Sequence, residues 1–189
     1  MVYNTHMKKI VIIIGVIVVI GLWVGGTYNS LVTKNEAITT QWAQVETSYQ
    51  RRFDLIPNLV ESVKGVMSQE KAVFTALADA RSKYSGASTP DAKAAAAGQV
   101  ESALSRLLVV VENYPQLKSV EAVQVFMAEL SGTENRVSVE RGRYNEKVQE
   151  YNVGIKRFPG SIIASLFGFV ERSYFKANEA AQNAPQVKF

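Results

Sequence analysis

Residues 31–63 read LVTKNEAITTQWAQVETSYQRRFDLIPNLVESV, and the spacing of their apolar side chains decides the fold. These side chains recur at steps of mostly three and four residues, the pattern of a helix that packs one face against other helices. The stripe continues past residue 63 and comprises Leu31, Ile38, Trp42, Val45, Tyr49, Phe53, Ile56, Leu59 or Val60, Val63, Met67, Phe74, Leu77 and Tyr84. It predicts one long helix that reaches the loop beginning at Ser85.

Pro57 lies inside this stripe. A proline within a helix removes one backbone donor and crowds the preceding turn. Because the periodicity continues on both sides, we predict a bend at Pro57 and keep a break there as the alternative.

Two further stripes predict two further helices. Thr89-Pro90-Asp91 is a start signal, since it supplies an N-cap hydroxyl, a proline suited to the first turn and an acid at the positive helix end. This helix ends at Pro115, and the next runs from near Lys118 to Phe158-Pro159-Gly160. The two stripes are Val100, Leu104, Leu107, Val111 and Tyr114, then Val123, Phe126, Leu130, Thr133, Val137, Glu140 or Arg141, Tyr144, Val148, Tyr151, Ile155 and Phe158.

The last part of the chain is less regular. Ser161–Val170 is strongly apolar but too short to cross a bilayer, and Glu171–Gln182 predicts a last amphipathic turn or two. No segment shows the alternation typical of a strand. Helices with one apolar stripe bury it only by packing together. We therefore predict an all-α fold, an elongated antiparallel bundle of three long helices and a shorter C-terminal helix, with an N-terminal transmembrane helix.

Residues 10–33 carry no formal charge, and Ile10 to Tyr28 is long enough to cross about 30 Å of hydrocarbon at about 1.5 Å per residue. Trp23 and Tyr28 are placed as interfacial anchors. We predict a signal anchor. A cleaved signal peptide is one alternative, but no Ala-x-Ala cleavage site follows the apolar stretch. A buried helix of a soluble protein is another, but it would need a larger protein around it. The predicted divisions are residues 1–9 as a short tail, 10–28 as the span, 29–182 as the bundle and 183–189 as a flexible tail.

The composition excludes several classes of chemistry. The chain has no Cys, and its one His is His6, which rules out disulfides, thiolate metal sites and Ser-His or Cys-His catalysis within one chain. Without Lys8 and Lys9 the remainder has 19 bases and 17 acids, too balanced to suggest nucleic acid. We expect no catalytic or metal-binding residue, no cofactor and no small-molecule substrate.

Charged residues gather at two places on the predicted helices, beside Pro57 and around residues 134–143. Beside Pro57 they are either a partner-binding or self-assembly site, or Asp54 pairs with an arginine and caps the backbone groups loosened by Pro57. Around residues 134–143 we favour an internal polar network with Arg51 or Arg52 that fixes helix register, over paired carboxylates for acid-base chemistry. The candidate cluster is Arg51, Arg52, Asp54, Pro57, Glu134, Arg136 and Arg141.

Two other features are candidates for contacts. Ser161–Val170 either packs on the bundle or touches lipid or another copy, through Ile162, Ile163, Leu166, Phe167 and Phe169. The pairs Tyr28-Asn29, Tyr144-Asn145 and Tyr151-Asn152 place an Asn at the edge of a stripe, where it could bond between helices.

Many blocks of sequence occur in an order that resembles the LemA family. They are YNSLV at 28–32, Trp42, RRFDLIPNLV at 51–60, VKG at 63–65, ENYPQLK at 112–118, TENR at 133–136, RGRYN at 141–145, Tyr151-Asn152 and Phe158-Pro159. Ser119 and Gly142 depart from the family pattern, but both departures are local. The resemblance implies a bacterial membrane-anchored bundle of long helices. The family includes magnetosome-membrane proteins and has no family-wide catalytic residues to carry over.

Three functions remain as hypotheses. The first is a non-enzymatic scaffold or interaction module of the bacterial envelope, which binds further copies of itself or other envelope proteins. The second is a membrane-surface or membrane-remodelling module that uses residues 161–170, and the third is a hydrolase or lyase. Lys8 and Lys9 precede the span, so the positive-inside tendency puts the N-terminus in the cytoplasm. The bundle would then lie on the periplasmic or extracytoplasmic side of the inner membrane.

Overall fold

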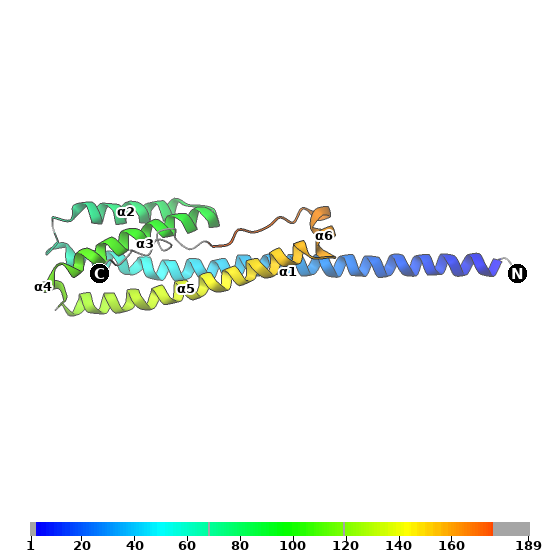
Figure 1. The fold of residues 1–189 in the computed structure, drawn as a ribbon, viewed down its shortest axis with the longest axis horizontal. Coiled ribbons are helices and arrows are strands. Elements are labelled where there is room, and N and C mark those ends of the chain that lie inside the picture. Colours follow the sequence, from blue (N-terminus) through cyan, green and yellow to red (C-terminus); the bar gives the residue numbers. More distant parts are fainter. Residues whose placement is uncertain (1–2, 68, 119, 176–189) are drawn as a thin grey trace, which may run out of the picture. The chain divides into compact units, whose positions relative to one another are not determined.

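The computed structural model describes residues 3–67, 69–118 and 120–175, and side chains within 7–67, 69–117 and 120–175. Within these ranges every regular element is a helix, which confirms the all-α prediction (Figure 1). The elements are α1 (Tyr3–Lys64), α2 (Lys71–Gly86), α3 (Pro90–Glu112), α4 (Pro115–Lys118), α5 (Glu121–Lys156) and α6 (Gly160–Phe167).

The chain forms two compact units. Unit 1 comprises Met1–Thr40 and Glu146–Ser173, and unit 2 comprises Gln41–Asn145 and Tyr174–Phe189. The helices α1 and α5 each contribute one segment to each unit.

Unit 2 is a four-helix bundle of α2, α3 and the adjoining segments of α1 and α5. Trp42 of α1 packs edge-on against Tyr144 of α5, with ring centroids 5.4 Å apart. Phe53 of α1 meets Tyr84 of α2 in the same manner at 4.8 Å. Most side chains of the predicted stripes are buried: Val45, Tyr49, Phe53, Ile56, Leu59, Val63, Met67, Leu77, Tyr84, Val100, Leu104, Leu107, Val111, Val123, Leu130, Val137 and Tyr144. Phe74, Tyr114 and Phe126 of the same stripes are only half-buried, and Leu117, which the stripes did not include, is fully buried.

The first long helix does not continue to Tyr84, so that prediction is wrong. Helix α1 ends at Lys64, and α2 folds back along it after a turn closed by bonds from Met67 N to Val63 O (3.0 Å) and Glu70 N to Met67 O (3.0 Å). Gly65 follows the last helical residue, where glycine disfavours a continued helix. Met67 stays fully buried within the turn, so the apolar spacing persists although the helix does not.

Helix α1 passes through Pro57, so the alternative of a break at that residue is wrong. The predicted bend stays a prediction. The start signal at Thr89 is confirmed, because its hydroxyl accepts a hydrogen bond from Ala92 N at 3.2 Å and Pro90 is the first residue of α3.

In unit 1, α5 packs on α1 and α6 packs on α5 through small residues. A Cβ at Gly154 would lie 3.2 Å from Leu31 Cδ2. A Cβ at Gly160, the first residue of α6, would overlap the carbonyl oxygen of Gly154. Only glycine therefore fits at the start of α6, because the two backbones meet there directly.

Residues 169–175 are not helical, so the amphipathic turns expected from Glu171 are absent as far as Phe175. The rest of that segment, and the tail at 183–189, lie outside the described residues. In unit 1, Asn152 holds Arg172 through Nδ2 to its carbonyl (2.9 Å) and Oδ1 from its N–H (2.9 Å). In unit 2, Asn145 holds Phe175 in the same way at 3.0 and 2.7 Å. The amides of Asn145 and Asn152 therefore bond to the non-helical segment 169–175. We had predicted that they bond between helices.

Two of the described helices are long and apolar enough to cross a membrane, α1 and α3. The apolar window of α1 near the N-terminus has no buried residue, whereas 39% of the α3 window is buried. Since α3 supplies core residues to the bundle of unit 2, the candidate membrane span is the N-terminal part of α1.

Candidate interaction surfaces

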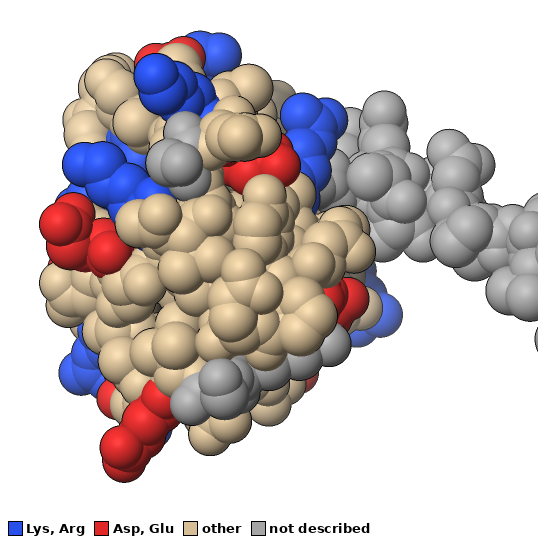
Figure 2. All heavy atoms as spheres, turned by 90° about the vertical axis from the view of Figure 1, so that its left-hand side faces the viewer, with Lys and Arg blue, Asp and Glu red and all other residues tan. Residues whose placement is uncertain are grey.

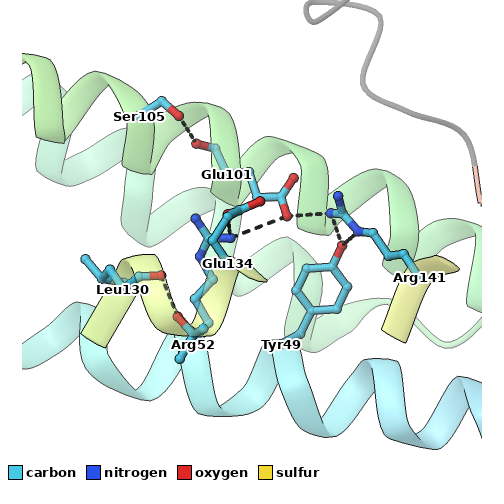
Figure 3. A network of polar contacts seen from close by, with 8 residues as sticks. Tyr49, Arg52, Glu101, Ser105, Leu130, Glu134 and Arg141 are labelled. Atoms are coloured by element: carbon cyan, nitrogen blue, oxygen red, sulfur yellow. Dashed lines mark hydrogen bonds and ion pairs between the residues drawn. The ribbon is translucent and has the colours of Figure 1, made fainter. Parts of the chain in front are cut away.

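A polar network lies between helices in the middle of unit 2. Arg52 and Tyr49 come from α1, Glu101 from α3, and Glu134 and Arg141 from α5 (Figure 3). The Arg52 guanidinium pairs with Glu134 and lies 3.8 Å from Glu101. Arg141 pairs with Glu101 and donates from Nε to the Tyr49 hydroxyl at 2.8 Å. The network thus joins three helices.

Burial and charge balance set the electrostatics of the network. Two arginines face two glutamates, so the formal charges cancel, as a buried ion network requires. The Arg52 Nε is buried and donates to no atom among the described residues. A buried donor without a partner costs free energy, so this nitrogen reduces the stability that the network contributes.

Burial raises the pKa of the Tyr49 hydroxyl well above its ordinary value, and the Glu101 carboxylate raises it further. Burial also lowers the pKa of Arg52, against the attraction of Glu101. For Arg141 burial acts in the same direction, but the hydrogen bond and charge of Glu101 and the Tyr49 hydroxyl raise its pKa overall. Tyr49 therefore stays neutral and Arg141 cationic near pH 7, which suits the hydrogen bond from Arg141 Nε to the Tyr49 hydroxyl.

The predicted cluster divides between two places. Arg52, Glu134 and Arg141 meet in the network, but Arg51 and Arg136 do not. Arg51 and Arg136 are exposed and line an open groove between α1 and α5. Adjacent residues on a helix point about 100° apart, which is why Arg51 and Arg52 separate.

Asp54 and Pro57 are exposed on α1. Asp54 accepts a hydrogen bond from Gln50 Nε2 at 2.7 Å and pairs with no arginine of the described residues, so the expected ion pair is absent. Sequence reasoning missed Glu101 and Tyr49, the two residues that link Arg141 to the other helices. Tyr49 was predicted as a core residue only, and nothing in the sequence separates Glu101 from exposed acids.

The apolar segment 161–170 is partly buried and partly exposed. Ile163 is buried, so it is not part of the predicted surface patch, and Phe169 is half-buried. The exposed apolar side chains, which we call the α6 patch, are Phe158, Ile162, Leu166, Phe167 and Val170. Phe158 was predicted on the buried stripe of α5, but that helix ends at Lys156 and the side chain is 73% exposed.

The α6 patch adjoins the predicted interfacial aromatics of α1. The rings of Trp23 and Phe158 lie 5.6 Å apart. Tyr28 contacts Phe167 at 4.9 Å and Phe169 at 5.6 Å. The patch and the end of the candidate span therefore form one continuous apolar and aromatic surface in unit 1.

Among the described residues, no group of three His, Cys, Asp or Glu side chains is placed to hold a metal ion.

Comparison with known proteins places the sequence. The profile of the LemA family matches residues 41–189, most of the chain. The chain belongs to the LemA family. The match covers every residue of the polar network and the α6 patch, and it begins where unit 2 begins.

Relatives of this LemA-family chain include magnetosome proteins. It is 28% identical to magnetosome protein MamQ 2 of Paramagnetospirillum magneticum, across 81% of this chain and 66% of that protein. It is 27% identical to magnetosome protein MamQ of Magnetospirillum gryphiswaldense, across 85% of this chain and 70% of that protein. The chain thus spans about two thirds of the length of these relatives.

We expect Glu101→Ala to destabilise unit 2, because it leaves Arg141 and Arg52 without a shared carboxylate. Breaking a fully buried ion pair costs about 3–5 kcal/mol, and partial exposure here reduces the expected loss to about 2–3 kcal/mol. Thermal and urea unfolding of the full chain in detergent micelles, followed by circular dichroism, measures the loss. The control is Glu112→Ala, an exposed acid at the end of the same helix, which should change stability little. Equal effects of the two substitutions would contradict a role for the network.

Proposed function

We propose that this protein is a non-enzymatic, membrane-anchored scaffold of the bacterial envelope, which binds further copies of itself or other envelope proteins. The observation that carries the proposal is that α1 contributes both to the candidate membrane span and to the core of unit 2. One helix of 62 residues holds both an apolar segment with no buried residue and the core positions of unit 2. Membrane attachment and the bundle are therefore encoded in a single element.

The described surface of unit 2 supports an interaction role. Figure 2 shows the end of this unit that carries α4, where Lys, Arg, Asp and Glu lie mainly around the edge and uncharged residues fill the middle. Exposed apolar side chains at the nearby turns include Val66 and Val120. A charge-poor centre with a charged rim is the usual composition of a protein interface. The relatives are named as magnetosome proteins, and this naming is compatible with a role at a membrane.

We further propose a single-pass topology in the inner membrane, with the N-terminus in the cytoplasm and the bundle outside. Lys8 and Lys9 stand directly before the exposed apolar run, and the next base along α1 is Lys34. Because the chain has no Cys, Ser88→Cys in the exposed loop between α2 and α3 creates a single reactive thiol. We expect a membrane-impermeant maleimide to label it in spheroplasts without lysis. Labelling only after lysis would reverse the proposed orientation.

The scaffold proposal predicts crosslinks from the charge-poor end of unit 2. A photoreactive residue at Val66 or Val120, in the full chain in native membranes, should give adducts with a second copy or a defined envelope protein, identified by mass spectrometry. The matched control is the same residue at Ala95, exposed on α3 outside that end. We expect few adducts from the control. A chain that stays monomeric after gentle extraction and gives no adduct from Val66 or Val120 contradicts the scaffold proposal.

A second function is favoured by the α6 patch, namely binding or remodelling of the membrane surface. Leu166 is 72% exposed, and the patch adjoins Trp23 and Tyr28 at the end of the candidate span. Apolar side chains next to interfacial aromatics suit a helix that lies in the headgroup region. The contact would add to the anchor, because each exposed large apolar side chain contributes about 1.5–3 kcal/mol when it is fully buried.

We expect a fluorescent label on Leu166→Cys to be quenched by brominated lipids when the full chain is reconstituted in liposomes. The same label on Ser88→Cys, in a water-exposed loop, serves as the control and should be quenched little. Equal, weak quenching at both positions would argue against contact between the α6 patch and lipid.

A further inference from the structure

We infer that the open groove between α1 and α5 in unit 2 binds a compact anion that carries phosphate groups. The groove has a volume of about 400 Å³, within the range of small-ligand sites. Three arginines line it, Arg51 from α1 and Arg136 and Arg143 from α5. Arg136 and Arg143 are seven residues apart, or two helical turns, so they lie on one face of α5.

The charge in this groove is not balanced, in contrast to the neutral network that contains Arg52. Glu140 is the one acidic side chain of the lining, so three positive charges face one negative charge. Its carboxylate accepts bonds from Arg143 Nη1 at 2.8 Å and from Gln41 Nε2 at 2.6 Å. Arg51 and Arg136 have no ion pair within the described residues. Two guanidinium groups are therefore available to an incoming anion.

The types of donor that line the groove suit phosphate. A guanidinium presents paired N–H groups that match two oxygens of a phosphate, and such charge-assisted bonds are about twice as strong as neutral ones. Ser48 lines the same groove, and its hydroxyl makes no hydrogen bond among the described residues, so it can donate as well. Thr47 already donates to the Ala43 carbonyl at 2.8 Å. Several donors around a small volume favour a multiply charged group such as a diphosphate.

Titration of the full chain in detergent micelles with inorganic pyrophosphate, at physiological ionic strength, tests the site by calorimetry. We expect saturable binding at one site, and the double substitution Arg51→Gln with Arg136→Gln should weaken it at least about tenfold, since each charge-assisted bond is worth about that factor. The control, Arg81→Gln with Arg106→Gln, removes the same charge from residues outside the groove and should retain the affinity. Circular dichroism verifies that each variant is folded.

Glu140→Gln gives an opposite expectation, because it removes the one competing carboxylate and should tighten pyrophosphate binding. Absence of saturable binding, an equal loss in the control pair, or weaker binding by Glu140→Gln would each overturn the inference. Nanodiscs distinguish the source of the phosphate. If phosphatidic acid in the disc competes with pyrophosphate, the natural ligand is a lipid headgroup, and if affinity matches that in phosphatidylcholine discs, it is a soluble phosphate compound.

Discussion

Burial of one apolar face of α1 is the constraint on which the rest of unit 2 depends. The side chains from Val45 to Val63 on that face are almost fully removed from solvent, and every other long helix of the unit contributes residues that cover them. Removing apolar surface from water is the main favourable term in folding, at about 25 cal/mol per Å². Helices α2 and α3 form a hairpin whose own stripes, which include Leu77 and Leu104, are buried in the same core.

The polar network within this core has a different role. Buried ion pairs contribute little net stability, since their attraction must first offset the loss of hydration. Their benefit is selectivity, because a shifted helix would leave a charge without its partner. Arg141 of α5 contacts two other helices, because it pairs with Glu101 of α3 and donates to Tyr49 of α1. The network thus joins three helices at defined positions, and we propose that it fixes their register.

The sequence predicted the stripes and their burial because helical periodicity is a local property. It failed at the turn after Lys64, where Met67 keeps the periodic spacing while the chain reverses. Arg52, Glu134 and Arg141 were predicted as members of a polar cluster, and the structure brings them together. Glu101 could not be predicted, since its role depends on which helix lies opposite it. Arg51 and Arg136 separate from the network because neighbours on a helix face different directions.

The direct backbone contact between Gly154 and Gly160 determines where the α6 patch lies. Helix α6 starts where its backbone touches that of α5, and Leu166 lies less than two turns further on. A methyl group at residue 160 would overlap the Gly154 carbonyl oxygen, so α6 would have to move away from α5. Its exposed apolar side chains would then face another direction, although none of them had been substituted. The exposed apolar surface of unit 1 therefore depends on Gly160, a buried residue without a side chain.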